Sequence, residues 1–219
     1  MIFSIFQIFG STCVWLMLKI FTKLEIDGLE RLKDAEKPVI VIGNHESNLD
    51  PTLIGIVFLH KPRLFPIRFM AKNEFFAIPG FNLLIYILGS FKSNKGKGLE
   101  NSLKNPFHIL RRKGTVMMFP EGRIVPERGV LGRGRRGAAA LAIMSGSGIL
   151  PMSIHTPHNL TPWRMVFTRR SSKLIKVNIG EVFYLDNVTY PDISDETTSR
   201  ATEEVMSEIR KLYSQHRYE

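Results

Sequence analysis

The fold is constrained most by three short apolar runs, residues 38–43, 115–119 and 149–150, which lead directly into Pro-marked or polar turns. Runs of this length that are bounded by Pro or Gly and rich in β-branched residues are typical of buried strands. Helical patterns lie between them, so the sequence predicts an α/β fold with a mostly parallel or mixed central sheet flanked by helices. The turns at the ends of such strands gather along one edge of the sheet, where ligands bind.

His45 lies just beyond the first run and Asp50 follows it five positions later. A histidine past a strand end is well placed to act as a general base. Asp50 has two possible roles: N-cap of a helix that opens with Pro51, and carboxylate that binds one ring nitrogen of His45 and fixes its tautomer. This spacing is common by chance, and the alternative is a loop histidine beside a plain helix cap.

A second motif follows the next run, where Phe119 and Pro120 precede Glu121 and Gly122. Together with Asn44-His45 and Asp50, and with a strand ending at Pro151, it resembles the 1-acylglycerol-3-phosphate acyltransferases over residues 24–182. The resemblance implies a membrane-associated O-acyltransferase that moves a fatty acyl chain from acyl-CoA or acyl-carrier protein, as co-substrate, to the sn-2 hydroxyl of a lysophosphatidate. It also implies that His45 is the base, that Asp50 orients it, and that neither cofactor nor metal is needed.

The same resemblance assigns the substrate-binding residues. Glu121, with Gly122 beside it at the same strand end, would bind the acceptor's glycerol hydroxyl or brace the site, and Arg123 would pair with the acceptor's phosphate. Lys95 stands where the family has a phosphate-binding arginine, and Arg136 precedes the Gly-Ala that opens a helix. Two departures concern the acceptor: lysine lacks arginine's two-pronged fork, and Arg123 follows Gly122 directly, where the family more often has an intervening Thr.

Residues 2–18 carry no charge, which predicts a membrane anchor or interfacial helix over residues 1–23, followed by a single domain over residues 24–219. The apolar stretch is at the lower limit for a bilayer span. Lys19 and Lys23 follow it and would place the domain on the cytoplasmic face. The alternative is a soluble protein whose N-terminal helix packs on the core.

The chain has 30 Lys and Arg against 20 Asp and Glu, a net charge of +10, so anionic partners are expected: an anionic lysophospholipid, the acyl donor and a membrane surface. No recognisable nucleic-acid reading element is present, so no nucleic-acid partner is expected. Two other readings stay open: the same scaffold acting on another lysolipid or a glycolipid, and a non-catalytic basic protein of membranes or nucleic acid.

Four local expectations complete the interpretation. The apolar stretch 81–88 is assigned mainly to the core, and His155 and His158 to the surface. A helix over residues 198–217 presents a core-packing face, since it has apolar residues at 3.6-residue spacing. The single cysteine, Cys13, excludes an internal disulfide.

Overall fold

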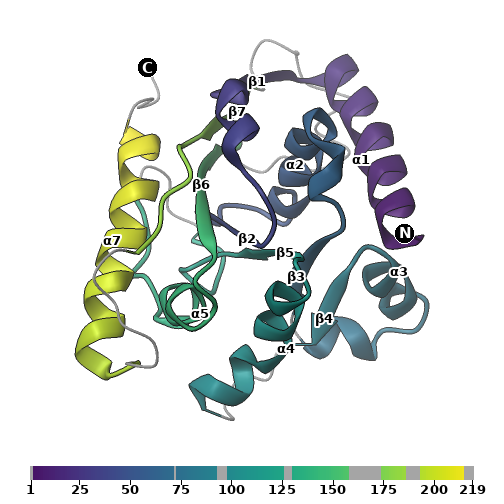
Figure 1. Cartoon of the computed structure of the whole chain (residues 1–219). Coiled ribbons are helices and arrows are strands. Elements are labelled where there is room, and N and C mark those ends of the chain that lie inside the picture. Colours follow the sequence, from purple (N-terminus) through teal and green to yellow (C-terminus); the bar gives the residue numbers. More distant parts are fainter. Residues whose placement is uncertain are drawn as a thin grey trace.

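The computed structural model describes residues 2–71, 73–92, 98–125, 130–157, 174–185 and 193–214. Its centre is a seven-stranded sheet of order β1-β7-β6-β2-β5-β3-β4 (Figure 1). All neighbouring pairs are parallel except β6 and β7. The predicted mixed α/β fold is confirmed. The strands are β1 (Lys23–Asp27), β2 (Val39–Gly43), β3 (Ile67–Ala71), β4 (Ser90–Lys92), β5 (Thr115–Met118), β6 (Gly148–His155) and β7 (Leu174–Ile179).

Helices cover both faces of the sheet, and strand β2 shows why. Val39 and Val41 of β2 pack with α1 and α2, whereas Ile40 and Ile42 pack with α4, α5 and α7. A strand buried on both faces needs an unbroken apolar run, which β2 supplies. The helices are α1 (Ile2–Phe21), α2 (Asp50–Val57), α3 (Phe81–Ile87), α4 (Leu99–Arg111), α5 (Gly137–Ser145) and α7 (Asp195–Ser214), with short 3-10 turns η1 (Leu29–Asp34), η2 (Phe58–His60), η3 (Pro62–Leu64) and η4 (Asn73–Ala77).

The parallel strands β2, β5 and β6 are neighbours, so the loops that follow them leave the sheet at the same edge. The expectation that the third strand ends at Pro151 is wrong, because β6 runs on to His155. Pro151 lies between the bridge from Ile149 to Phe183 and the β6–β7 ladder, which begins at Met152. A strand tolerates a residue without an amide hydrogen at such an interruption.

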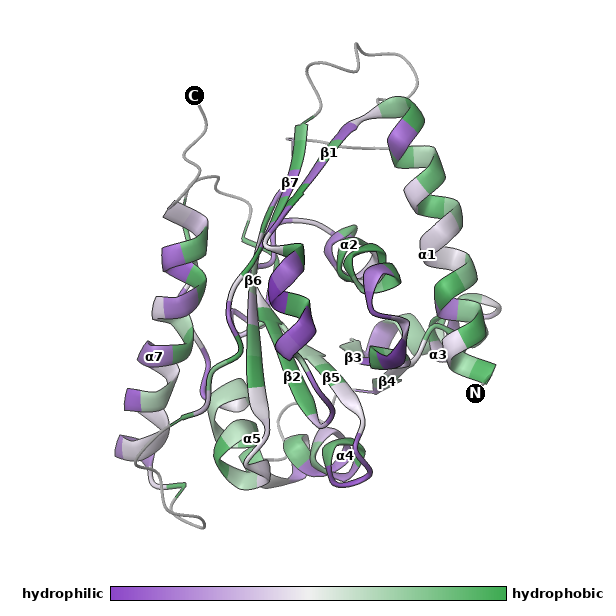
Figure 2. Cartoon of the chain, turned by 45° about the horizontal axis from the view of Figure 1, so that its top comes forward, coloured by the Kyte–Doolittle hydropathy of each residue, from purple (hydrophilic) through white to green (hydrophobic). Residues whose placement is uncertain are grey.

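The C-terminal helix α7 has the predicted amphipathic pattern, visible as alternating colours in Figure 2. Its buried face packs on the sheet through Ala201, Val205 and Ile209. Assignment of the stretch 81–88 to the core, in contrast, is wrong: of the residues of α3, only Ile85 is buried. This short helix lies at the margin of the sheet beside edge strand β4, where η4, β4 and α1 contact it.

Helix α1 packs on the domain through one stripe and leaves the rest of its surface exposed. Gln7, Ser11 and Leu18 are buried. Over the most apolar stretch of 18 residues in α1, only 17% is buried inside the structure. By length and composition α1 could cross a membrane. Together with η4, the turn after it and α3, it forms what we call the apolar margin, whose exposed side chains are Ile2, Ile5, Phe6, Phe9, Leu16, Met17, Ile20, Phe75, Ile78, Phe81, Leu83, Leu84 and Tyr86.

The buried stripe of α1 is fixed by a single amide side chain. Gln7 Nε2 donates to the carbonyl oxygens of Ile67 (2.6 Å) and Leu88 (2.7 Å), and its Oε1 accepts from the Ile67 N–H (2.9 Å). One side chain thereby joins α1 to β3 and to the end of α3. Buried backbone groups of this kind need such partners.

Gln7→Leu should lower the free energy of unfolding by about 2–4 kcal/mol, because it leaves buried backbone groups of Ile67 and Leu88 without partners. Urea unfolding in mild detergent, followed by circular dichroism, measures the change. Cys13→Ala, on the exposed part of the same helix, should stay within about 0.5 kcal/mol of the wild type. Equal stabilities for the two variants would contradict this role of Gln7.

Candidate active site

His45 and Asp50 meet in the loop between β2 and α2. His45 Nδ1 lies 2.9 Å from Asp50 Oδ2; the carboxylate is fully buried, and the imidazole is 17% exposed. The ring stacks on Phe119 with centroids 4.0 Å apart and planes 10° from parallel. The imidazole is therefore fixed by a hydrogen bond at one nitrogen and by an aromatic face, while part of it remains accessible.

Asp50 does not cap helix α2, so that part of the expectation is wrong. The helix has no side-chain cap hydrogen bond, and the carboxylate turns back to the preceding loop instead. Besides His45, it accepts hydrogen bonds from the N–H of Glu46 (2.8 Å), the N–H of Ser47 (2.8 Å) and the Ser47 hydroxyl (2.5 Å). Oδ2 accepts both backbone N–H bonds and Oδ1 accepts the hydroxyl bond. Because Oδ2 is an acceptor, it favours the His45 tautomer in which Nδ1 carries the proton, and in a neutral imidazole of that tautomer Nε2 has the lone pair.

Two residues beside His45 attach the loop to strand β6. The Asn44 amide exchanges two hydrogen bonds of 2.7 Å with the Ile154 backbone. The Glu46 carboxylate accepts from the Thr156 N–H (3.0 Å) and from the Tyr213 hydroxyl of α7 (2.7 Å). The sequence analysis missed this network, since Glu46 and Tyr213 are 167 residues apart and neither belongs to a motif.

His155 is buried, with 4% of its surface exposed, and its ring stacks on Tyr213 at 4.3 Å. Its assignment to the surface is therefore wrong. The reason is that β6 continues to this position and is covered by α7. His158 lies outside the described residues. Within the part of the chain that the structure describes, no group of three or more His, Cys, Asp or Glu residues could hold a metal ion.

Glu121 follows β5 at the same sheet edge, and only 3% of its surface is exposed. Its Oε1 accepts from the Gly132 N–H at 3.3 Å, and its Oε2 is buried with no hydrogen-bond partner among the described residues. Burial raises the pKa of this carboxyl, an effect opposed by the Gly132 N–H and by His45. A second link between the motifs is the hydrogen bond from the Val125 N–H to the His45 carbonyl, at 2.8 Å.

Gly122 has a φ of +67°, which disfavours any side chain. A Cβ at this position would also lie 2.7 Å from Arg135 Cδ. Arg135 is in turn attached to the motif, because its N–H donates to the Pro120 carbonyl at 2.8 Å. The glycine is thus required by the backbone and by the arginine that crosses it.

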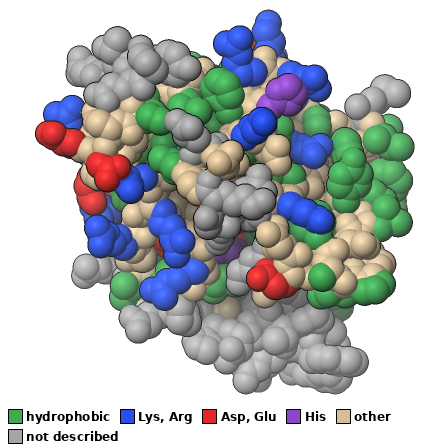
Figure 3. Space-filling view, turned by 90° about the horizontal axis from the view of Figure 1, so that it is seen from below, with side chains coloured by type: hydrophobic (Ala, Val, Ile, Leu, Met, Phe, Trp, Pro, Cys, Tyr) green, Lys and Arg blue, Asp and Glu red, His purple; other side chains and the backbone are tan. Residues whose placement is uncertain are grey.

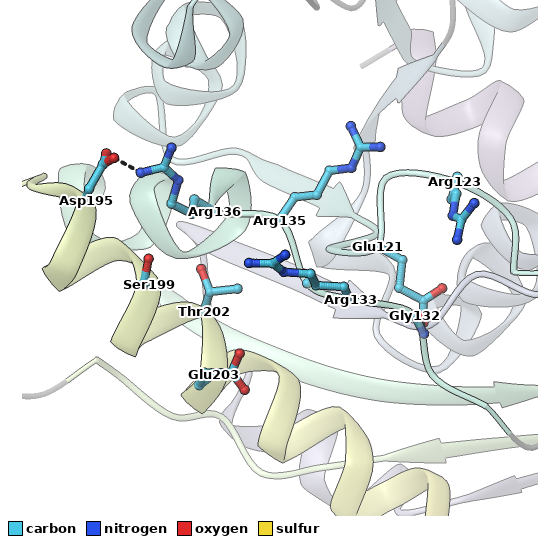
Figure 4. A pocket seen from close by; sticks show the side chains of 11 residues that line it. Glu121, Arg123, Gly132, Arg133, Arg135, Arg136, Asp195, Ser199, Thr202 and Glu203 are labelled. Atoms are coloured by element: carbon cyan, nitrogen blue, oxygen red, sulfur yellow. Dashed lines mark hydrogen bonds and ion pairs between the residues drawn. The ribbon is translucent and has the colours of Figure 1, made fainter.

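A basic cavity of about 620 Å³ opens beside Glu121, between the loop after β5 and helix α7 (Figure 4). Arg123 lies at the Glu121 end, and Arg136 lies at the far end, bound to Asp195 of α7. Arg123 therefore lies beside Glu121 in the cavity, whereas Arg136 already has a carboxylate partner. Lys95 lies outside the described residues. The other lining residues are Gly132, Arg133, Gly134, Arg135, Ser199, Thr202 and Glu203.

Comparison with known proteins agrees with this arrangement. The family model described as Acyltransferase matches residues 23–155, which carry β1 to β6 and both motifs. The chain belongs to the Acyltransferase family. Its N-terminal helix, residues 2–21, and its C-terminal helix lie outside the matched acyltransferase region.

Two relatives and one solved structure show how far the likeness reaches. This chain is 27% identical to a chloroplastic 1-acyl-sn-glycerol-3-phosphate acyltransferase of Arabidopsis thaliana. The match covers 68% of this chain but only about two fifths (41%) of that relative. The chain is 26% identical to the 1-acyl-sn-glycerol-3-phosphate acyltransferase of Pseudomonas aeruginosa over 87% of this chain and 71% of that protein. The fold is similar to the crystal structure of the 1-acyl-sn-glycerophosphate (LPA) acyltransferase PlsC from Thermotoga maritima, with a TM-score of 0.69 and 23% identity over 99% of this chain and 81% of that one.

Tyr213→Phe should lower the free energy of unfolding by about 1–3 kcal/mol, because the part-buried Glu46 carboxylate loses a hydroxyl donor while the ring remains in place. Chemical denaturation measures the difference. Tyr184→Phe is the matched control, since Tyr184 is 60% exposed. If both variants unfold like the wild type, the network does not hold the His45 loop.

Glu121→Gln should change how stability depends on pH. Because burial raises the pKa of Glu121, the wild type loses stability as the pH rises from the unfolded-state value of about 4.3 through the higher folded-state value. Glutamine cannot ionise, so the variant should unfold at a higher urea concentration than the wild type at neutral pH, and the two should converge at low pH. Glu203→Gln, which changes an exposed carboxyl of the same cavity, is the control and should unfold at the same urea concentration as the wild type at each pH. A difference between Glu121→Gln and the wild type that stays constant with pH would contradict the raised pKa.

Proposed function

We propose that this protein is a membrane-associated O-acyltransferase that transfers a fatty acyl chain from acyl-CoA or acyl-carrier protein to the sn-2 hydroxyl of 1-acylglycerol-3-phosphate, giving phosphatidic acid. The observation that carries the proposal is the buried Asp50 carboxylate bound to His45 Nδ1 at 2.9 Å, across one sheet edge from Glu121. Membership of the Acyltransferase family and the names of the similar proteins support it.

The geometry supports a direct transfer between the two substrates. His45 Nε2 removes the proton as the acceptor's hydroxyl oxygen attacks the thioester carbonyl. The tetrahedral intermediate then breaks its C–S bond, and the imidazolium returns the proton to the leaving thiolate. Asp50 stabilises the imidazolium without itself being protonated. Because a thioester is already activated, no protein nucleophile is needed.

The basic cavity fits the charge of the substrates. Among the described residues, Arg123, Arg133 and Arg135 line it without an ion pair to a protein carboxylate, which leaves their guanidinium groups available for phosphate. Arg123, beside Glu121, would hold the acceptor's phosphate while the Glu121 carboxyl, whose Oε2 has no described partner, accepts a glycerol hydroxyl. Arg136, bound to Asp195, would shape the far wall rather than bind substrate.

The apolar margin supports binding to a membrane, in an interfacial rather than a spanning arrangement. Figure 3 shows hydrophobic side chains along the right-hand side of the view and a second group near the top, with Lys and Arg mainly at the top and the left. Gln7 attaches α1 to the domain by hydrogen bonds and Ser11 is buried on the same side, so only the opposite side of α1 would enter the lipid. A lysolipid could then reach the site from the bilayer, with the domain on the cytoplasmic face.

The proposal predicts that His45→Gln lowers acyl transfer by about 10²–10⁴-fold, because the base is lost. Membranes containing the protein would be supplied with acyl-CoA or acyl-carrier protein and a panel of lysolipids, and the products identified by mass spectrometry. His60→Gln is the matched control, since His60 lies at the end of η2, where its Nδ1 is 3.2 Å from the Val57 carbonyl oxygen. That variant should retain the wild-type rate.

Each outcome has a defined meaning. A chain added to lysophosphatidate alone supports the proposed acceptor, whereas a product from another lysolipid or a glycolipid assigns the same chemistry to a different acceptor. Equal rates of product formation for the wild type and His45→Gln would overturn His45 as the base, and no product with any acceptor would overturn the enzyme. The remaining interpretation would be a non-catalytic basic protein of membranes.

A further inference from the structure

One arginine is placed within the apolar margin itself. Arg68 of β3 is half-buried, and its Cζ lies 4.7 Å from the centroid of the Phe3 ring of α1. Phe3 in turn contacts Tyr86 of α3 edge-on, with ring centroids 5.6 Å apart. The guanidinium is therefore set among the aromatic side chains that join the two helices of the margin.

The described part of the structure gives this guanidinium no anionic partner. Its Nε is buried without a hydrogen bond, and no ion pair to Arg68 occurs among the described residues, although Arg31, Arg63 and Arg136 each have one. Burial lowers the pKa of Arg68, and nearby Tyr86 opposes the shift. An arginine nevertheless stays protonated at neutral pH.

A positive charge among apolar side chains is costly unless an anion accompanies it. The cost would rise when the apolar margin enters a bilayer, because lipid replaces the water around it. We propose that Arg68 binds the phosphate of an anionic bilayer phospholipid, with Phe3 and Tyr86 forming the walls of the site. The inference rests on the membrane part of the proposed function.

The chemistry of the site favours a lipid phosphate over a soluble anion. Phe6 lies one helical turn from Phe3 in α1 and is 45% exposed, and Leu83 lies one turn from Tyr86 in α3 and is 60% exposed. Exposed apolar side chains on these two helices suit acyl chains rather than a water-soluble ligand. Phospholipid phosphates lie at the level where an arginine with a buried stem presents its head group. The planar guanidinium can donate two parallel hydrogen bonds to one phosphate while stacking on the Phe3 ring.

The test is flotation of the full-length protein with vesicles of phosphatidylcholine alone and of an equal mixture with phosphatidylglycerol. The wild type should bind both and prefer the mixture. Arg68→Gln should lose little affinity for phosphatidylcholine, whose phosphate is balanced by its own choline cation, but lose about fivefold for the mixture, the effect of one cation at a lipid surface. Arg63→Gln, an exposed arginine outside the margin whose guanidinium pairs with Glu36, is the control for overall charge and should lose much less. Arg68→Lys should fall between the wild type and Arg68→Gln, because it keeps the charge but not the planar fork.

Circular dichroism shows whether each variant is folded. If Arg68→Gln fails to fold, Arg68→Met, which keeps an apolar stem, takes its place. Equal losses for the Arg68 and Arg63 variants would reduce the effect to net charge and overturn the site. Failure of the wild type to float with either vesicle would overturn both the site and membrane docking, yet leave acyl transfer from soluble substrates to be measured independently.

Discussion

The site depends on a buried carboxylate whose hydrogen-bonding capacity is filled by its own loop. Asp50 accepts from two backbone N–H groups, a serine hydroxyl and His45, all within the turn from β2 to α2. Such a carboxylate is stable without water because every donor is supplied locally. It favours one tautomer and one orientation of His45, and this is the arrangement that the proposed general base would need.

The central strands turn that local arrangement into a shared site. Because β2 lies between β5 and β6 and all three run in one direction, His45, Glu121 and Thr156 follow strand ends at one edge. Backbone hydrogen bonds then join the loops, and Glu46 carries the connection on to α7 through Tyr213. The histidine loop is thus supported by the core strands and by the last helix, which comes from the far end of the chain.

In the proposed function, two surfaces would together bind an amphiphilic substrate. Arginines around Glu121 form a cavity suited to phosphate, while α1 and α3 present hydrophobic side chains to the outside. Gln7 connects the apolar helix to β3 and the end of α3. A lipid substrate needs both surfaces, and Arg68 places a positive charge within the apolar one.

The sequence by itself determined the sheet, the His45–Asp50 pair, the Glu121 turn and the amphipathic α7, because strand patterns and short-range spacing are local properties. The Asp50–His45 contact could be predicted since both residues belong to one loop. Only the tertiary structure decided that α3 faces outward, that β6 continues past Pro151 to bury His155, that Arg136 pairs with Asp195, and that Tyr213 holds Glu46. Each of these depends on which element covers which, and hydrophobicity or charge at one position does not specify the partner that packs against it.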